Sequence, residues 1–301
     1  MTSKWPSCVV IGFALAGSVE AQDIAFVSHT QQVELGQLSL PTDVDVGDDG
    51  KIYVVDSGNH QVAVFDAAGA RIASLGAWGV ERGQLDNPVG IGIGPEGRIY
   101  IADKGNQRIV VFDADGRLRR GIDLEEDGEK ASPVDVAVSP DGRELFITTN
   151  NSHRVLVYSD GGNFLRAWGG EGDGPGQFRF PATIDVDRAA NVFVVDVLNN
   201  RIQKFDPDGN VLGAFGKRGG KPGTFFRPKG VAVDTSGRIF VSDSYLGAVQ
   251  VLNTDGEFLY VLGDADGTTV FETPVGLAVT GNRLLIAEML AGRVRVLAVQ
   301  L

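Results

Sequence analysis

Oxygen-bearing side chains at one recurring position are the first residues in this chain whose types could do chemistry. Two residues after each of six regularly placed prolines the sequence has Asp43, Gly90, Asp135, Thr183, Gly230 and Gly276. Carboxylate and hydroxyl oxygens from separate segments are ligands that Ca²⁺ and Mg²⁺ prefer. If these segments converge on one axis, Asp43 and Asp135 predict a Ca²⁺ or Mg²⁺ site there. The alternative, which we favour, is ordinary turn chemistry at strand ends.

A second set consists of acids followed five residues later by arginine. Asp103 precedes Arg108, and Glu288 precedes Arg293 in the same way. One interpretation is a ring of functional carboxylates. The other is that each acid caps its own turn and pairs with its own arginine, as residues that define a repeat do. We favour the second, because function rarely needs the same group in every repeat.

The three histidines do not predict a catalytic zinc site. They are His29, His60 and His153, and the chain has a single cysteine. A catalytic zinc ion commonly needs three protein ligands, often histidines, with one open position. His60 and His153 occupy the same position in two repeats, which favours a structural role for both.

A local basic cluster stands out on a chain whose formal net charge is −12. It contains Lys217, Arg218, Lys221, Arg227 and Lys229. Exposed loops on a rigid frame are where binding residues collect, although a solvated charged loop is the alternative. Repeats that depart from the common pattern are the other candidates. The predicted ligand-binding residues are Arg227, Lys229, Tyr245, Asn150 and Glu288.

The elements that must position these residues form a repeat. The stretch RIYIADKGNQRIVVFDADG (98–116) recurs in similar form six times. The residue that follows its first apolar run is Asp56, Asp103, Thr149, Asp196, Asp243 or Glu288, at intervals of 45 to 47 residues. A fixed period of this size indicates a propeller or another repeat architecture.

Each repeat reads as four short strands joined by Gly, Asp and Asn turns. Continuous apolar runs such as 52–55 are typical of strands packed on both faces. Six such repeats predict an all-β fold, a six-bladed β-propeller of four-stranded antiparallel blades. The last repeat ends after its third strand, so we expect 23–27, with 33–35 nearby, to supply the missing edge and close the ring.

The first 21 residues have the layout of a signal peptide. Lys4 precedes the apolar stretch CVVIGFALAG (8–17), and small residues follow near Ala21. We therefore expect residues 1–21 to be removed, 22–301 to form one domain, and the protein to be periplasmic or secreted. The mature chain would contain no cysteine, and its sequence offers no transmembrane segment.

The repeats resemble NHL repeats. The resemblance is carried by Pro-x-Gly-Val-Ala-Val (228–233), by Asp196–Ile202 with its Asp-x-x-Asn-x-Arg-Ile pattern, and by Phe-Asp-x-x-Gly turns. It covers about residues 22–301 and implies the six-bladed propeller fold. Members of this group include ligand sensors, protein- or RNA-binding propellers and a lyase, so the resemblance does not select one function.

Taken together, these patterns predict an exported, non-catalytic binding or scaffold module that holds a protein, peptide or small ligand on its loop face. The acidic charge makes nucleic acid an unfavourable partner, and we expect a monomer. The alternative is a metal-dependent hydrolase or lyase with its site at the mouth of the propeller channel. An enzyme needs a convergent acid, base or metal constellation, for which Asp43 and Asp135 are the candidates.

Overall fold

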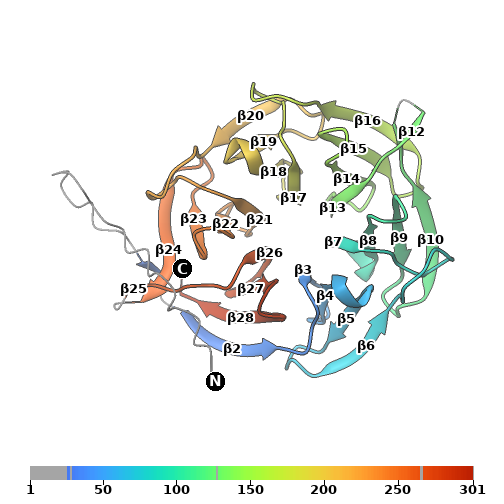
Figure 1. Ribbon diagram of the computed structural model, residues 1–301, viewed down its shortest axis with the longest axis horizontal. Coiled ribbons are helices and arrows are strands. Elements are labelled where there is room, and N and C mark those ends of the chain that lie inside the picture. Colours follow the sequence, from blue (N-terminus) through green and yellow to red (C-terminus); the bar gives the residue numbers. More distant parts are fainter. Residues whose placement is uncertain (1–25, 28, 127, 265–266, 301) are drawn as a thin grey trace, which may run out of the picture.

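The computed structural model describes residues 26–27, 29–126, 128–264 and 267–300. The proposed signal peptide, 1–21, lies outside this part of the chain. Six four-stranded antiparallel sheets stand around a central axis, and their innermost strands lie nearest that axis (Figure 1). Residues of these innermost strands line a central channel. The predicted six-bladed β-propeller is therefore confirmed.

The first three blades follow one another along the chain. Blade 1 contains β3 (Pro41–Val46), β4 (Ile52–Asp56), β5 (Gln61–Phe65) and β6 (Arg71–Leu75). Blade 2 contains β7 (Pro88–Ile93), β8 (Ile99–Asp103), β9 (Arg108–Phe112) and β10 (Leu118–Asp123). Blade 3 contains β13 (Pro133–Val138), β14 (Glu144–Thr149), β15 (Arg154–Ser159) and β16 (Phe164–Gly169). A hairpin of β11 (Glu125–Glu126) and β12 (Glu129–Lys130) precedes blade 3.

The other three blades complete the ring. Blade 4 contains β17 (Pro181–Val186), β18 (Val192–Asp196), β19 (Arg201–Phe205) and β20 (Val211–Phe215). Blade 5 contains β21 (Pro228–Val233), β22 (Ile239–Asp243), β23 (Ala248–Leu252) and β24 (Phe258–Asp264), with β25 (Gly267–Thr268) paired to β24. Blade 6 contains β26 (Pro274–Thr280), β27 (Arg283–Glu288) and β28 (Arg293–Val299). Short 3₁₀ helices η1 (Ser57–Asn59), η2 (Pro95–Gly97) and η3 (Val197–Asn199) lie in turns.

Closure of the ring differs in part from the expectation. The outer strand of blade 6 is β2 (His29–Leu35), which pairs antiparallel with β28. The segment expected to close the ring supplies instead β1 (Phe26–Val27), which pairs parallel with β24 of blade 5. An N-terminal strand does close the ring, but it is the stretch that includes 33–35. The first four residues of this strand, HTQQ, are all polar, so the sequence pattern indicated only its last three residues, 33–35.

The hydrophobic core lies between the blades. It divides into six clusters, and each one joins side chains of two neighbouring blades. The second and third strands of the blades contribute most of these side chains. All five residues of β4 are buried, as are those of β8 and β18. This confirms that the continuous apolar runs are strands covered on both faces.

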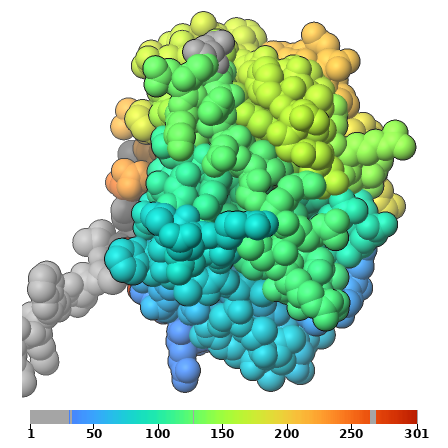
Figure 2. Space-filling view, turned by 90° about the vertical axis from the view of Figure 1, so that its right-hand side faces the viewer, coloured from blue at the N-terminus to red at the C-terminus, as the bar shows by residue number. Residues whose placement is uncertain are grey.

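The propeller has two faces, which are formed by different sets of loops. On the loop face lie the blade-to-blade loops and the turns between second and third strands. On the turn face lie the remaining tight turns, such as 47–51 and 113–117. Outer strands form the wall between the faces, and Figure 2 shows consecutive segments of blades 1 to 3 packed along that wall. Among the residues that the structure describes, no helix is long and apolar enough to cross a membrane.

Candidate functional site

The recurring acids after the second strands hold the loop face together. Asp103 is fully buried, accepts the backbone N–H of Asp86 at 2.7 Å and binds Arg108 Nε at 2.8 Å. Asp196 makes the same contacts with the N–H of Arg179 and with Arg201. Each acid therefore holds in place, through this hydrogen bond, the loop that precedes its own blade. This supports the structural interpretation of the acid–arginine pairs.

Glu288, one of the predicted ligand-binding residues, belongs to this framework. Its carboxylate is fully buried and accepts the N–H of Glu272 and the guanidinium groups of Arg293 and Arg295. Burial alone would raise its pKa, but the hydrogen bonds from Arg295 and Arg293 hold the pKa of Glu288 below its usual value. It presents no exposed surface to a ligand.

The histidines at the matched position are also framework residues. His60 accepts the N–H of Asn87 at Nδ1, and His153 accepts the N–H of Phe180, each at 3.0 Å. Both have positive φ, 53° and 56°, because each closes the turn after a second strand. The side chain of His29 lies outside the described part of the structure.

The carboxyl groups of Asp43 and Asp135, each two residues after a repeat proline, lie close together inside the channel. Asp43 on β3 accepts the N–H of Ile91 on the next blade, and Asp135 on β13 accepts the N–H of Ile184. A side-chain hydrogen bond also joins Asp43 to Asp135. Thr183 makes the corresponding link from blade 4, accepting the N–H of Val231. These side chains connect the innermost strand of one blade to that of the next.

A second acidic layer lies closer to the turn face. Asp45 accepts the N–H of Ile93, and Asp185 accepts the N–H of Val233, both at 2.7 Å. This layer is not among the residues predicted from the sequence, although acids also stand four residues after Pro41 and Pro181. Both layers line one channel of about 220 Å³.

The channel acids are poised to hold protons near neutral pH. Burial raises the pKa of Asp45 to about 6 and the pKa of Asp185 to about 7. Burial also raises the pKa of Asp135 to about 7. The pKa of Asp43 is well above its ordinary value, first because of burial and then because of the charge on Asp135. Asp43 is thus the protonated partner that donates to Asp135.

These residues do not fit the Ca²⁺ or Mg²⁺ site that the sequence suggested. The oxygens of Asp43 and Asp135 are already engaged by backbone N–H groups and by each other. Within the described ranges, no group of three or more His, Cys, Asp or Glu is arranged to hold a metal ion. The donor set therefore favours proton storage and strand linkage over metal binding.

Cations gather at the loop-face mouth of the same channel. Lys229 is the second residue of β21, and its pKa is lowered first by burial and then by the positive charges of Arg227 and Lys104. Lys104 comes from blade 2, opposite blade 5. In the described part of the chain, none of the three forms an ion pair with an acid. Lys104 was missed because its position in the repeat carries no common residue type.

The structure brings three of the predicted ligand-binding residues together. The N–H groups of Arg227 and Tyr245 both donate to Asp243, and the Tyr245 ring lies 5.2 Å from that of Phe226. Lys229 follows in the same segment. Asn150 lies apart from them, in the corresponding turn of blade 3, and Glu288 is buried in blade 6.

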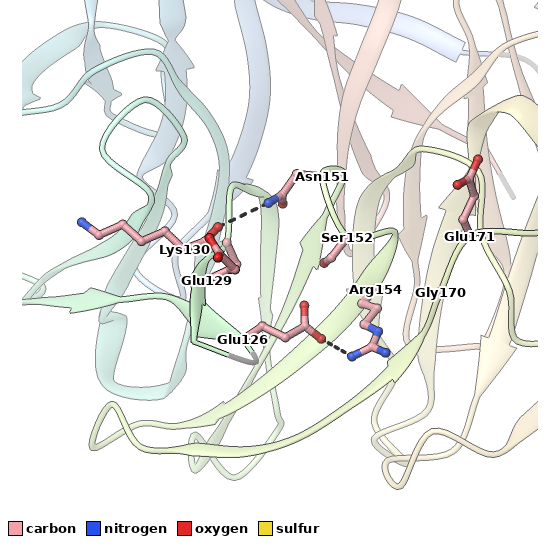
Figure 3. Close-up of a pocket in the computed structure, with 9 residues that line it drawn as sticks. Glu126, Glu129, Lys130, Asn151, Ser152, Arg154, Gly170 and Glu171 are labelled. Carbon is pink, nitrogen blue, oxygen red and sulfur yellow. Dashed lines mark hydrogen bonds and ion pairs between the residues drawn. The ribbon is translucent and has the colours of Figure 1, made fainter.

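A polar pocket of about 400 Å³ opens beside the blade 3 turn (Figure 3). In blades 2 and 4 an arginine, Arg108 or Arg201, donates hydrogen bonds to backbone carbonyl groups of the loop that precedes the blade. In blade 3 Thr149 replaces the acid, and Arg154 binds Glu126 of the β11–β12 hairpin at 2.5 Å. Asn151 donates to the carbonyl of Lys130 at 3.3 Å. The residues that line the pocket include Asn151 and Ser152, which follow Asn150 in the turn.

Comparisons with known proteins agree with this architecture. A streptogramin B lyase structure shares 14% identity, with a TM-score of 0.65, covering 89% of this chain and 97% of its own. A gluconolactonase from Xanthomonas campestris shares 17% identity, with a TM-score of 0.67, covering 92% and 96%. A virginiamycin B lyase from Staphylococcus aureus shares 16% identity, with a TM-score of 0.61, covering 88% and 98%. At these identities the likeness carries the fold alone.

Sequence comparison adds the family. No curated protein matches the chain. The NHL resemblance stays a prediction, whereas the six-bladed propeller that it implied is confirmed. The model of the SMP-30/gluconolactonase/LRE-like region matches residues 43–263, which is well over half of the length, and the chain therefore belongs to that family.

Proposed function

We propose that this protein is an exported binding module that holds an anionic group at the loop-face mouth of its channel. The observation that carries the proposal is the meeting of Lys104, Arg227 and Lys229 with no acid paired to them in the described structure. Repulsion among three cations around a half-buried ammonium is unfavourable without a partner. A bound carboxylate or phosphate would relieve it and would restore the pKa of Lys229.

The architecture suits such a role. The rigid ring fixes the positions of the three cations on two opposite blades, so little conformational entropy is lost when a ligand binds. The NHL resemblance is consistent with binding through the loops. Export remains a proposal from the N-terminal sequence, and mass spectrometry of the secreted or periplasmic protein would test it by finding an N-terminus near Gln22.

A titration with citrate tests anion binding. We expect saturable binding by calorimetry that weakens as salt is raised, because salt screens exposed charges. Lys229→Gln and Arg227→Gln should each weaken it about tenfold. Arg188→Gln, an exposed arginine on the turn face, is the matched control and should leave the affinity unchanged. Absence of binding, or an equal effect of the control, would overturn the proposal.

A hydrolase or lyase acting at the channel is the second candidate. The family match and the fold shared with a gluconolactonase favour it. Asp135, with a pKa of about 7 and a carboxyl partner in a 220 Å³ channel, has the properties of a general base. Because the donor set does not fit a metal ion, we assign no step to one.

An assay with glucono-δ-lactone tests this second candidate. Activity that Asp135→Asn abolishes, while thermal melting shows an intact fold, would support catalysis in the channel. Addition of Ca²⁺ or Mg²⁺ to the same assay would show whether either ion contributes. If wild type and Asp135→Asn hydrolyse the lactone no faster than buffer, this candidate loses its support for that substrate.

A further inference from the structure

Among the residues that the structure describes, large apolar side chains are exposed on one face of the ring and not on the other. Some of them, such as Ile72 and Leu212, lie on the outer strands β6 and β20. All the rest that the structure describes, among them Leu40, Trp78 and Phe180, lie on the loop face. Exposed apolar surface that gathers on one face is typical of an interaction site.

Three of these side chains occupy the same position in consecutive blades. Leu198, Tyr245 and Leu290 each lie two residues after the turn acid of blades 4, 5 and 6. Their exposed fractions are 56%, 59% and 69%. Blades 1, 2 and 3 have Gly58, Gly105 and Asn151 at this position, so the repeat itself does not require an apolar residue. We name Leu198, Tyr245 and Leu290 the apolar arc.

Hydrogen bonds place the apolar arc beside the channel mouth. The N–H of Leu198 donates to the carbonyl of Arg179, and the N–H of Ser244 donates to that of Arg227, at 3.1 and 3.0 Å. In blade 6, Met289 donates to Thr273 in the same way. Each acceptor lies one or two residues before an innermost strand. The arc therefore borders Arg227 and Lys229.

The two faces also differ in charge, and the cations lie on the same face as the exposed apolar side chains. The tight turns of the turn face contain many acids, including Asp48, Asp49, Asp113, Asp115, Asp206 and Asp208. The loop face has the three cations at its centre. An acidic partner would consequently be steered to the loop face and repelled from the other one.

The shape of the arc favours a polypeptide over a small molecule. The two cavities described above are lined by other residues, and the arc side chains lie on turns where more than half of each is exposed to solvent. Small ligands bind in concave pockets, whereas protein interfaces combine exposed apolar anchors with a charged surround. The ring contact between Tyr245 and Phe226 holds one such anchor in place.

We propose that the loop face over blades 4 to 6 binds an acidic polypeptide segment. Its large apolar side chains lie on the apolar arc, and its carboxylates meet Arg227, Lys229 and Lys104. This inference rests on the proposed function and names the class of partner that the cationic mouth recognises.

A set of fluorescein-labelled peptides tests the partner class. In the first peptide, Glu and Asp alternate with Leu and Phe; the second has Ser at the apolar positions; the third has Lys at the acidic positions. We expect fluorescence anisotropy to detect binding of the first peptide, and at least about tenfold weaker binding of each of the other two.

Two triple variants test the surface. Leu198→Ser, Tyr245→Ser and Leu290→Ser together should weaken binding of the first peptide at least about tenfold. Ile72→Ser, Leu165→Ser and Leu212→Ser remove exposed apolar groups from the outer strands and should leave the affinity unchanged. Circular dichroism and thermal melting would establish that both variants are folded.

Citrate separates failure of this inference from failure of the proposed function. If citrate binds through Lys229 but the first peptide binds no better than the Ser peptide, the polypeptide inference is overturned and anion binding stands. Equal loss of peptide affinity in the two triple variants would also overturn the inference. If neither citrate nor any peptide binds, both are overturned.

Discussion

The carboxyl group of Asp43 on blade 1 donates a hydrogen bond to that of Asp135 on blade 3. Blade 2 stands between them, and Gly90 is its residue at the same position. A Cβ on Gly90 would lie 2.5 Å from the Cα of Asp135, so the missing side chain makes room for this contact. The acids and the glycines after the prolines are thus two parts of one packing arrangement around the channel.

Stability should depend on pH through the channel acids. In the folded state the pKa values of Asp45, Asp135 and Asp185 lie near 6 to 7, above the ordinary 3.8. Between about pH 4 and 7 the folded state therefore binds more protons than the unfolded state, and stability falls as pH rises. Each of these carboxyl groups contributes a loss on the order of a few kcal/mol over this interval.

Urea unfolding at a series of pH values measures this dependence. Asp45→Asn with Asp185→Asn should make the fall in stability between pH 4 and 7 smaller, because amides do not titrate there, while Asp43 and Asp135 still do. A wild-type protein whose stability rises steadily across that interval would contradict the raised pKa values.

Because Asp43 and Asp135 share a proton, Asp43→Asn should reduce stability less than Asp43→Ala. Asp43→Asn retains a donor for Asp135 and should change the free energy of unfolding by less than about 1 kcal/mol. Asp43→Ala leaves the N–H of Ile91 and the buried Asp135 without their partner, and should cost about 2–4 kcal/mol. Chemical denaturation near pH 6 compares the two, and equal losses would argue against a protonated Asp43.

The sequence predicted the fold more fully than the site, for a physical reason. The repeat predicted the blades and their buried second strands, because the same pattern of apolar residues occurs in all six copies. The mouth cluster is different: Lys104 and Lys229 are far apart in sequence, and only closure of the ring brings blade 2 opposite blade 5. Glu288 is the opposite case. It was predicted to bind a ligand because its repeat departs from the common pattern, but its carboxylate is bound by Arg293 and Arg295.

Close approach of neighbouring blades predicts a strong effect at Gly276. A Cβ there would lie 2.5 Å from the Cα of Asp43, so Gly276→Ala must push blade 6 away from blade 1. We expect a loss of about 1–3 kcal/mol. Gly36→Ala is the matched control, because no atom lies within 4 Å of its added Cβ. Comparable melting temperatures for the two variants would refute the packing account.

The β11–β12 hairpin should depend on one of its glutamates more than on the other. Glu126 is nearly buried and pairs with Arg154, so Glu126→Ala should cost about 1 kcal/mol and expose the hairpin to protease. Glu129→Ala removes an exposed carboxylate and should change stability by no more than about 0.5 kcal/mol. Limited proteolysis followed by mass spectrometry would locate the cleavage, and equal susceptibility would contradict the role of the Glu126–Arg154 pair.

Ring closure makes the N-terminal strands unequal. Removing residues up to Val27 deletes β1, a two-residue parallel pairing, and should lower the melting temperature only slightly. Removing residues up to Leu35 also deletes β2, which exposes the edge of β28 and withdraws the fully buried Leu35 from the core between blades 6 and 1. That truncation should lower the melting temperature steeply and promote aggregation through the free edge. Both truncations, made without the first 21 residues, can be compared by calorimetry and light scattering. A β2 deletion that melts like the β1 deletion would show that the propeller is held shut elsewhere.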